Sequence, residues 1–293
     1  MPPTPERPAL VRGLAILAAT LALALAAQPA PALHGLFAPK AELWERWTAH
    51  DPSAPAAIDH RPWQRFLEGY VRRDAAGLNR VAYGRVGAAD KAALERYLGG
   101  LAATPISGFR RPEQLAYWIN LYNGLTVKLV LEYRGVESIR DIDISPGLVS
   151  DGPWGRKLIE VEGVPVSLDD IEHRILRPIW RDPRLHYALS CAATGCPNLS
   201  LTAFSGRNAE ALLTRGARDF VNSGHGVRFE HGKLVVSSLY VWFKADFGGS
   251  DAAVIAHLRR YAEPALAARL AAHLAARRGI DDDSYDWSLN QRP

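Results

Sequence analysis

Residues 113–133 read EQLAYWINLYNGLTVKLVLEY, and they predict the central helix of the protein. Pro112 suits the first turn of a helix, and Gly135 suits the position just after a helix C-terminus. Apolar side chains occur on nearly every side of this predicted helix, which is typical of a helix enclosed by other elements. We therefore expect the core of the domain to form around it.

The rest of the chain predicts helices and a few short strands. Helical periodicity or Ala-rich composition predicts helices over residues 63–70, 88–101, 168–180, 203–221, 251–261 and 264–278. Glu162-Gly163 and His231-Gly232 are hairpin signals, so we expect the strand pairs 157–161/164–167 and 227–229/234–236. Residues 185–190 read as a buried strand. The pattern indicates a single helix-rich α+β domain around a small mixed or antiparallel sheet.

The composition is that of a globular protein. The 293 residues are 48% hydrophobic and 23% charged, which excludes a disordered, collagen-like or coiled-coil chain. The net charge of +4 is small and evenly spread, so we expect no nucleic-acid partner.

The N-terminus has the pattern of a secretory signal peptide. Arg12 precedes an apolar run from Gly13 to Ala27 that is shorter than a membrane span, and Ala-x-Ala patterns surround it. We expect a periplasmic or secreted protein without a transmembrane domain once the signal is removed; an uncleaved signal that anchors the chain in the membrane is the alternative. The expected organisation is a signal peptide (1–30), a Pro/Ala-rich linker and lead-in (31–57), one α+β domain (58–278) and an acidic C-terminal tail (279–293) with a solvated charge run at 281–283.

Three polar residues lie where the pattern is otherwise apolar. Asn120 and Asn123 are three residues apart and so share one face of the central helix. An unpaired buried amide costs about 1–3 kcal/mol, so each must either tie down neighbouring backbone or bind a ligand. Asp246 lies among aromatic residues and needs a helix N-terminus or a cation as its partner. We treat all three as candidate substrate-binding residues.

Cys191 and Cys196 are the two cysteines of the sequence, and three interpretations of them stay open. A disulfide is the default in an exported protein. Alternatively, one thiol is a nucleophile with a histidine as its base. In the third interpretation both thiolates bind zinc together with His173 or His186, although Cys-x4-Cys is wider than the usual zinc knuckle. We expect no metal and no cofactor.

Two functional hypotheses follow from these residues. The first is an exported thiol-dependent hydrolase or acyltransferase, in which Cys191 is the nucleophile and His173 the base. Glu172 or Asn120 would orient the base, and His186 and Cys196 complete the candidate catalytic set. The alternative is a non-enzymatic envelope binding module with a structural Cys191–Cys196 disulfide, whose partner is an envelope component or a small-molecule ligand. The other histidines, among them His60, His257 and His273, have no partner at ligand spacing and are expected at the surface.

Six segments together resemble the family called domain of unknown function 547: 113–123, 138–142, 167–173, 186–191, 195–197 and 242–248. They occur in the right order within residues 60–275. The family's motif residues fall on Asn120, Asn123, Glu172, His173, His186, Cys191, Cys196 and Asp246. The resemblance implies a family of exported bacterial proteins and larger plant proteins with no assigned activity. It also implies a fold similar to papain-like and transglutaminase-like cysteine enzymes.

Overall fold

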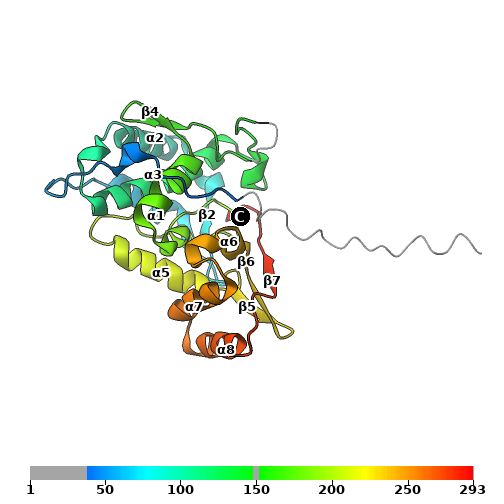
Figure 1. Cartoon of the computed structure of the whole chain (residues 1–293). Helices are drawn as coiled ribbons and strands as arrows, with labels where there is room; N and C mark the ends of the chain where they lie inside the picture. Colours follow the sequence, from blue (N-terminus) through cyan, green and yellow to red (C-terminus); the bar gives the residue numbers. More distant parts are fainter. Residues whose placement is uncertain (1–37, 148–151, 293) are drawn as a thin grey trace, which may run out of the picture. The chain divides into compact units, whose positions relative to one another are not determined.

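The predicted central helix is α3 (Arg111–Glu132), whose side chains are buried on nearly all sides. The computed structural model describes residues 38–147 and 152–292. Helix α2 (Ala88–Ala102) packs against α3, and α1 (Arg61–Tyr70) packs against α2 (Figure 1). Trp118 of α3 meets Trp47 edge to face at 5.0 Å, so the lead-in segment also contributes to this core. The prediction of a buried central helix is confirmed.

The other elements are short. The remaining α-helices are α4 (Arg177–Trp180), α5 (Ala209–Val221), α6 (Ser238–Trp242), α7 (Asp251–Tyr261) and α8 (Pro264–Ala275). A π-helix, η6 (Asp170–Leu176), leads into α4. The 3₁₀ helices are η2 (Glu45–Thr48), η3 (Tyr83–Arg85), η4 (Ile106–Gly108), η5 (Ile139–Asp141), η7 (Pro183–Tyr187) and η8 (Lys244–Phe247). Within the described ranges, no helix combines the length and apolar character needed to cross a bilayer.

Three small sheets accompany the helices, so the α+β class is confirmed. Two are antiparallel hairpins, β1 (Val71–Arg73) with β2 (Asn79–Val81) and β3 (Ile159–Val161) with β4 (Val164–Val166). In the third, β5 (Val227–Glu230) pairs antiparallel with β6 (Lys233–Ser237), and β7 (Asp282–Ser284) pairs parallel with β6. Both predicted hairpins are present. Glu162 and His231 adopt the left-handed conformation beside Gly163 and Gly232, as such tight turns require.

The apolar residues form two main clusters. The larger surrounds α3, and the smaller lies among α5, α7, α8 and the β5–β6 hairpin (Figure 1). The candidate site residues lie where the two clusters approach each other, because η7 contributes Leu185 to the larger cluster and Tyr187 to the smaller one. This position explains why a polar group there must find its partners within the protein.

The strand predicted at residues 185–190 is wrong. The chain forms η7 instead, and Pro183 occupies its first turn while the Asp182 side chain accepts the backbone N–H of Arg184 at 2.9 Å. In the following loop, the Asn123 side chain, and not a neighbouring strand, pairs with the Ala188 carbonyl and the Ser190 N–H. The periodicity rule failed because a short apolar run does not distinguish a strand from a buried turn of helix.

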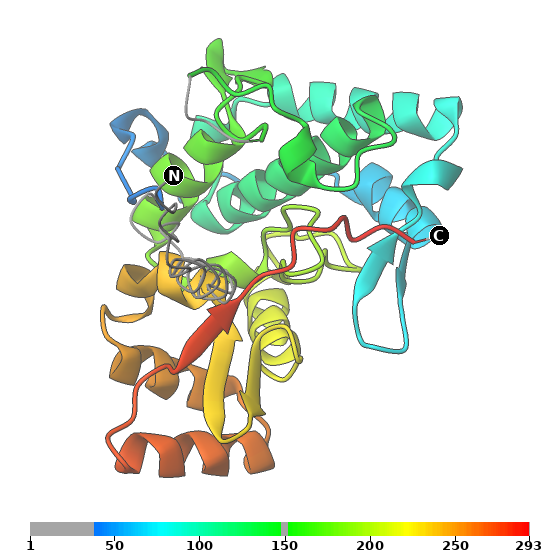
Figure 2. The ribbon, with the colours of Figure 1, turned by 90° about the vertical axis from the view of Figure 1, so that its right-hand side faces the viewer.

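The C-terminal residues are not a detached tail. Strand β7 pairs with β6, and the chain then runs along the loop that contains the two cysteines (Figure 2). Backbone bonds join residues 192–195 to residues 286–290, and Val81 pairs with Gln291. Leu289 and Asn290 are buried, so this part of the segment packs on the domain, whereas Asp281 and Asp282 in the predicted charge run are exposed. We call residues 282–292 the C-terminal strap.

Three histidines expected at the surface are buried, which corrects that prediction. His60, His257 and His273 are 6%, 9% and 6% exposed. His60 bonds the Tyr97 hydroxyl at 2.7 Å and His257 bonds the Tyr187 hydroxyl at 2.8 Å. Burial lowers the pKa of both imidazoles to about 4. Their partners lie far away in the sequence, so spacing gave no sign of them. The helix predicted at 203–221 begins only at Ala209, because residues 203–208 form a loop.

Candidate functional site

The side chains of Asn120 and Asn123 each hydrogen-bond backbone groups through both the amide nitrogen and the amide oxygen. The Asn120 amide donates to the Phe204 carbonyl at 2.8 Å and accepts the Phe204 N–H at 3.1 Å. Asn123 in the same way donates to the Ala188 carbonyl at 2.9 Å and accepts the Ser190 N–H at 2.8 Å. These bonds attach the loops that contain Phe204 and Ala188 to helix α3. Their role in substrate binding stays a prediction.

Five predicted or newly found residues form what we call the buried polar network: Glu172, His173, Arg177, His186 and Asp246. Glu172 and His173 lie on the π-helix η6, Arg177 begins α4, His186 lies on η7, and Asp246 lies on η8. A π-helix adds one residue per turn, and such turns often occur at functional sites. Here, the π-helix and α4 lie close to η7, which follows them directly in the sequence, and to η8, which is distant in the sequence.

Arg177 and His186 are the two partners of the Asp246 carboxylate. Arg177 Nε donates to Asp246 Oδ2 at 2.6 Å, and His186 Nε2 donates to the same oxygen at 2.7 Å. Burial raises the pKa of Asp246, but the hydrogen bonds from His186 and Arg177 outweigh it and hold this pKa well below its usual value. Of the two partners expected for Asp246, a helix N-terminus or a cation, the structure provides the cation, Arg177.

His173 is a neutral imidazole whose acceptor nitrogen is occupied. Arg177 Nη1 donates to His173 Nδ1 at 2.8 Å, and the same guanidinium nitrogen donates to the Pro39 carbonyl at 2.8 Å. Burial, opposed in part by the charge of Glu172, lowers the pKa of His173 to about 4. Glu172 Oε1 lies 3.9 Å from His173 Nδ1 and 3.7 Å from His186 Nδ1.

Phe243 covers the network. Its ring stacks on His186 at 4.6 Å and lies 5.7 Å from the His173 ring, while the Arg177 guanidinium lies 4.6 Å from its centroid. The side chains of His186 and Arg177 are only 2% and 5% exposed. The network is therefore shielded from solvent by an aromatic ring rather than open to it.

Cys191 and Cys196 form a disulfide, with Cα atoms 6.1 Å apart. The Cys191 N–H donates to the Cys196 sulfur at 2.9 Å, which orients the short loop between them. With both sulfurs in this bond, neither is a thiolate ligand for zinc. Among the described residues, no group of three or more His, Cys, Asp or Glu side chains could hold a metal ion.

The C-terminal strap brings two aromatic residues to the disulfide. The Tyr285 hydroxyl lies 3.1 Å from each sulfur, and Trp287 packs on the same cluster. Burial and the charge of Glu172 raise the pKa of Tyr285 above its usual value, so the hydroxyl stays protonated. Tyr285 therefore contacts the disulfide and lies within range of the charge of Glu172.

Asp169 is the exposed acid at the edge of this region. Its Oδ1 lies 3.6 Å from His173 Nε2, and its side chain is 42% exposed. Loss of water around the carboxyl raises its pKa to about 7, and the negative charges of Glu172 and Asp170 add to this effect. The unfavourable interaction with Glu172 indicates a local excess of negative charge.

Sequence reasoning missed Arg177, Tyr285 and Asp169. The sequence pointed to Arg177 only indirectly, because it showed that Asp246 needs a partner but not which residue is that partner. The two aromatic residues of the strap, Tyr285 and Trp287, stand out in a segment otherwise rich in Asp, and this was the available signal. No spacing rule connects them with Cys191, because the contact depends on the path of the strap.

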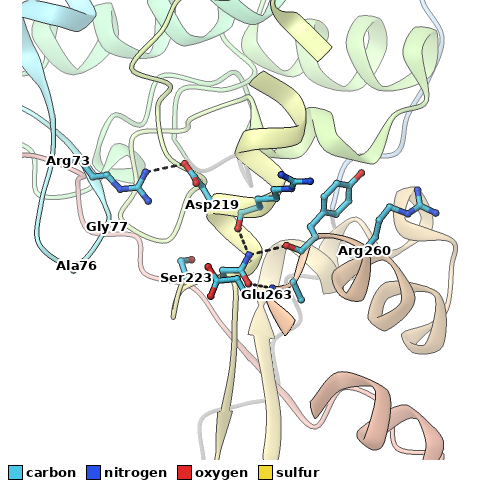
Figure 3. A pocket seen from close by; sticks show the side chains of 11 residues that line it. Arg73, Ala76, Gly77, Asp219, Ser223, Arg260 and Glu263 are labelled. Atoms are coloured by element: carbon cyan, nitrogen blue, oxygen red, sulfur yellow. Dashed lines mark hydrogen bonds and ion pairs between the residues drawn. The ribbon is translucent and has the colours of Figure 1, made fainter. Parts of the chain in front are cut away.

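A cleft of about 560 Å³ lies elsewhere in the fold, and none of the predicted site residues lines it. Figure 3 shows Arg73 reaching toward Asp219, which it meets at 3.1 Å. The Asn222 amide donates to the carbonyls of Arg218 and Tyr261 at 2.7 and 3.0 Å, which satisfies the ends of two helices. The cleft is open and its polar groups serve the fold, so we do not assign the candidate site to it.

The comparison with protein families identifies the central part of the chain. The family described as "Protein of unknown function, DUF547" matches residues 106–221. Over this segment the chain is similar to the DUF547 family. The DUF547 match includes α3, the π-helix, His186 and both cysteines, and it ends before Asp246 and Tyr285. No curated protein and no solved structure matches the chain, so the similarity to papain-like enzymes stays a prediction.

Proposed function

We propose that this protein is a non-enzymatic binding module that works outside the cytoplasm, with Cys191–Cys196 as a structural disulfide. The observation that carries the proposal is the bond between the two sulfurs. A thiol nucleophile must be present as a thiolate, and a sulfur in a disulfide is not. The strap then packs on this bond through Tyr285 and Trp287.

The buried polar network also supports a structural role for the histidines. A general base needs a free lone pair within reach of the proton it removes. His173 Nδ1 already accepts from Arg177, and His186 Nε2 already donates to Asp246. The predicted base would have to break an internal hydrogen bond before it could act.

Export is part of the proposal. The pattern of residues 1–30 and the disulfide both support it, because disulfides persist mainly in oxidising compartments. Fractionation of cells that express the full chain, followed by N-terminal sequencing of the recovered protein, tests it. A cytoplasmic protein that keeps Met1 and has free thiols would contradict export.

The disulfide itself is tested by intact mass. The native protein is treated with an alkylating reagent before and after reduction, and the added mass counts the free thiols. We expect no labelling before reduction and two labels after it. Two thiols that react without reductant, at unequal rates, would instead favour the enzyme.

A thiol-dependent hydrolase or acyltransferase is the second candidate. The observation that favours it is the Tyr285 hydroxyl 3.1 Å from Cys191 Sγ, since a donor at this position would stabilise a thiolate formed by reduction. After mild reduction, Cys191 would then react with thiol reagents, and Tyr285→Phe would slow this reaction. Equal and slow labelling of both, or labelling and turnover unchanged in Cys191→Ala, would rule this candidate out.

A further inference from the structure

Four aromatic side chains form a continuous cluster beside the disulfide, which we call the aromatic surface: Trp154, Trp242, Tyr285 and Trp287. Tyr285 lies 4.8 Å from Trp242 and 4.6 Å from Trp287, measured between ring centroids. Trp287 in turn contacts Trp242 at 5.7 Å and Trp154 at 5.9 Å. All four residues keep part of their surface exposed to solvent. A group of large aromatic residues that is not fully covered is typical of a binding surface.

The aromatic surface already accepts one cation from within the protein. The Arg140 guanidinium lies 5.2 Å from the centroid of the Trp287 ring. The faces of indole and phenol rings carry negative potential and so attract cations, most strongly when water is partly excluded. The ring faces of Trp242 and Tyr285 offer the same chemistry.

Acidic groups stand next to this surface. The Asp169 N–H donates to the Trp154 carbonyl at 3.0 Å, so the two residues are held together through their backbones. The charge of Glu172 raises the pKa of both Tyr285 and Tyr122, after burial as the larger cause. Asp169 is exposed enough to meet a ligand, whereas Glu172 is 13% exposed. The region therefore combines aromatic faces with the carboxylates of Asp169 and Glu172.

We propose that the aromatic surface, together with Asp169, binds an organic ammonium group. This inference rests on the proposed binding function and names its ligand class. The rings supply cation–π attraction and apolar contact for the alkyl groups, and the carboxylate supplies charge complementarity. A small inorganic cation lacks the apolar contact, and a neutral ligand lacks the charge attraction.

Choline and its neutral isostere 3,3-dimethylbutan-1-ol are the probes. They have nearly the same shape and differ in the charge of the central atom, so their difference measures the electrostatic part of binding. Calorimetric titration of the purified full chain with its disulfide intact should give about tenfold tighter binding of choline, equivalent to about 1.4 kcal/mol. Equal binding of the two probes, or no binding of choline, would overturn the proposal.

Matched variants locate the site. Trp242→Ala should weaken choline binding about tenfold, and Asp169→Asn should weaken it several-fold while keeping the shape of the side chain. Tyr285→Phe keeps the ring and should leave binding nearly unchanged. Tyr133→Ala, which removes an exposed ring elsewhere, is the negative control. If Trp242→Ala and Asp169→Asn both bind choline as the natural chain does, the ligand lies elsewhere and the assignment is wrong.

The pH dependence gives an independent readout. The charged or titratable groups that face Asp169 are Glu172, Asp170, Lys157 and His173. Because Asp169 loses its proton near pH 7, choline should bind more tightly as the pH rises through this value. Asp169→Asn should abolish this rise. If choline binding does not strengthen with pH in a protein whose disulfide is intact, the ammonium site is wrong. The proposed structural role of the disulfide would still stand.

Discussion

The buried polar network and the disulfide region are built on different physical principles. In the network, Arg177, Asp246 and His186 satisfy each other's charges and hydrogen bonds below the ring of Phe243. In the disulfide region, partly buried aromatic rings of the strap pack on a covalent bond. The sequence motifs of the family contribute to both regions. The comparison teaches that Cys, His and Glu residues that are close in the sequence can belong to two separate regions of the structure, one buried and one near the surface.

The strongest test of the network is Arg177→Met. The change removes the cation that serves Asp246, His173 and the Pro39 carbonyl, and it leaves a half-buried carboxylate with a single partner. Breaking a buried pair in this way should lower the free energy of unfolding by about 3–5 kcal/mol, measured by denaturant titration. The control is Arg61→Met, whose ion pair with Asp59 is exposed to solvent, so its loss should change the stability little. Equal effects of the two changes would show that the network contributes no special stability.

His173→Gln tests the network through its pH dependence. The folded protein holds the pKa of His173 near 4, below the 6.5 of the unfolded chain. Between these values the unfolded chain binds a proton that the folded protein does not, so stability falls as the pH decreases from 6.5 to 4. Glutamine does not titrate but can still accept from Arg177, so the variant should lose up to about 3 kcal/mol of this dependence. Unfolding curves at several pH values measure it, with His50→Gln as the exposed control. Parallel curves for His173→Gln and the natural chain would contradict the assignment.

The double change Cys191→Ala and Cys196→Ala tests the disulfide region. Closing so short a loop restricts the unfolded chain by about 2 kcal/mol, and removing the bond should cost about that much. The strap should also become easier to digest, because Tyr285 loses both sulfur contacts. Denaturant titration and limited proteolysis measure these effects. Unchanged stability in both assays would mean that the bond does not hold the strap.

The smallest expected effect is that of Tyr285→Phe. The hydroxyl bonds two sulfurs, which are weak acceptors, so its loss should cost less than about 1 kcal/mol. The same denaturant titration applies, and the double cysteine variant provides the matched background. In that background the change should have almost no effect. A large loss there would mean that the hydroxyl has a partner other than the sulfurs.

Local rules predicted part of the fold well. Helix α3 could be predicted because Pro112, a continuous apolar surface and Gly135 all act within a few residues. The two hairpins were predictable for the same reason. Residues 185–190 were not, because their backbone groups are satisfied by Asn123, an amide on a distant helix. The strap was misread because its partners β6, residues 192–195 and Val81 lie far from it in the sequence.

The candidate site shows the same division. The sequence indicated that Asn120, Asn123 and Asp246 needed partners, since a buried polar group without one is costly. It also offered a disulfide as one interpretation of Cys191 and Cys196. It could not identify Phe204, Ala188 or Arg177 as the partners, nor bring Tyr285 to the sulfurs.

The sequence by itself determined the α+β class, the buried central helix and the polar residues that had to be paired, because these follow from local periodicity and from the cost of burial. The tertiary structure alone decided the partners of those residues. It joined η6, η7 and η8 into one network, linked the two sulfurs, and brought the strap's aromatic rings to the disulfide. These contacts depend on long-range packing, which no spacing within the sequence records.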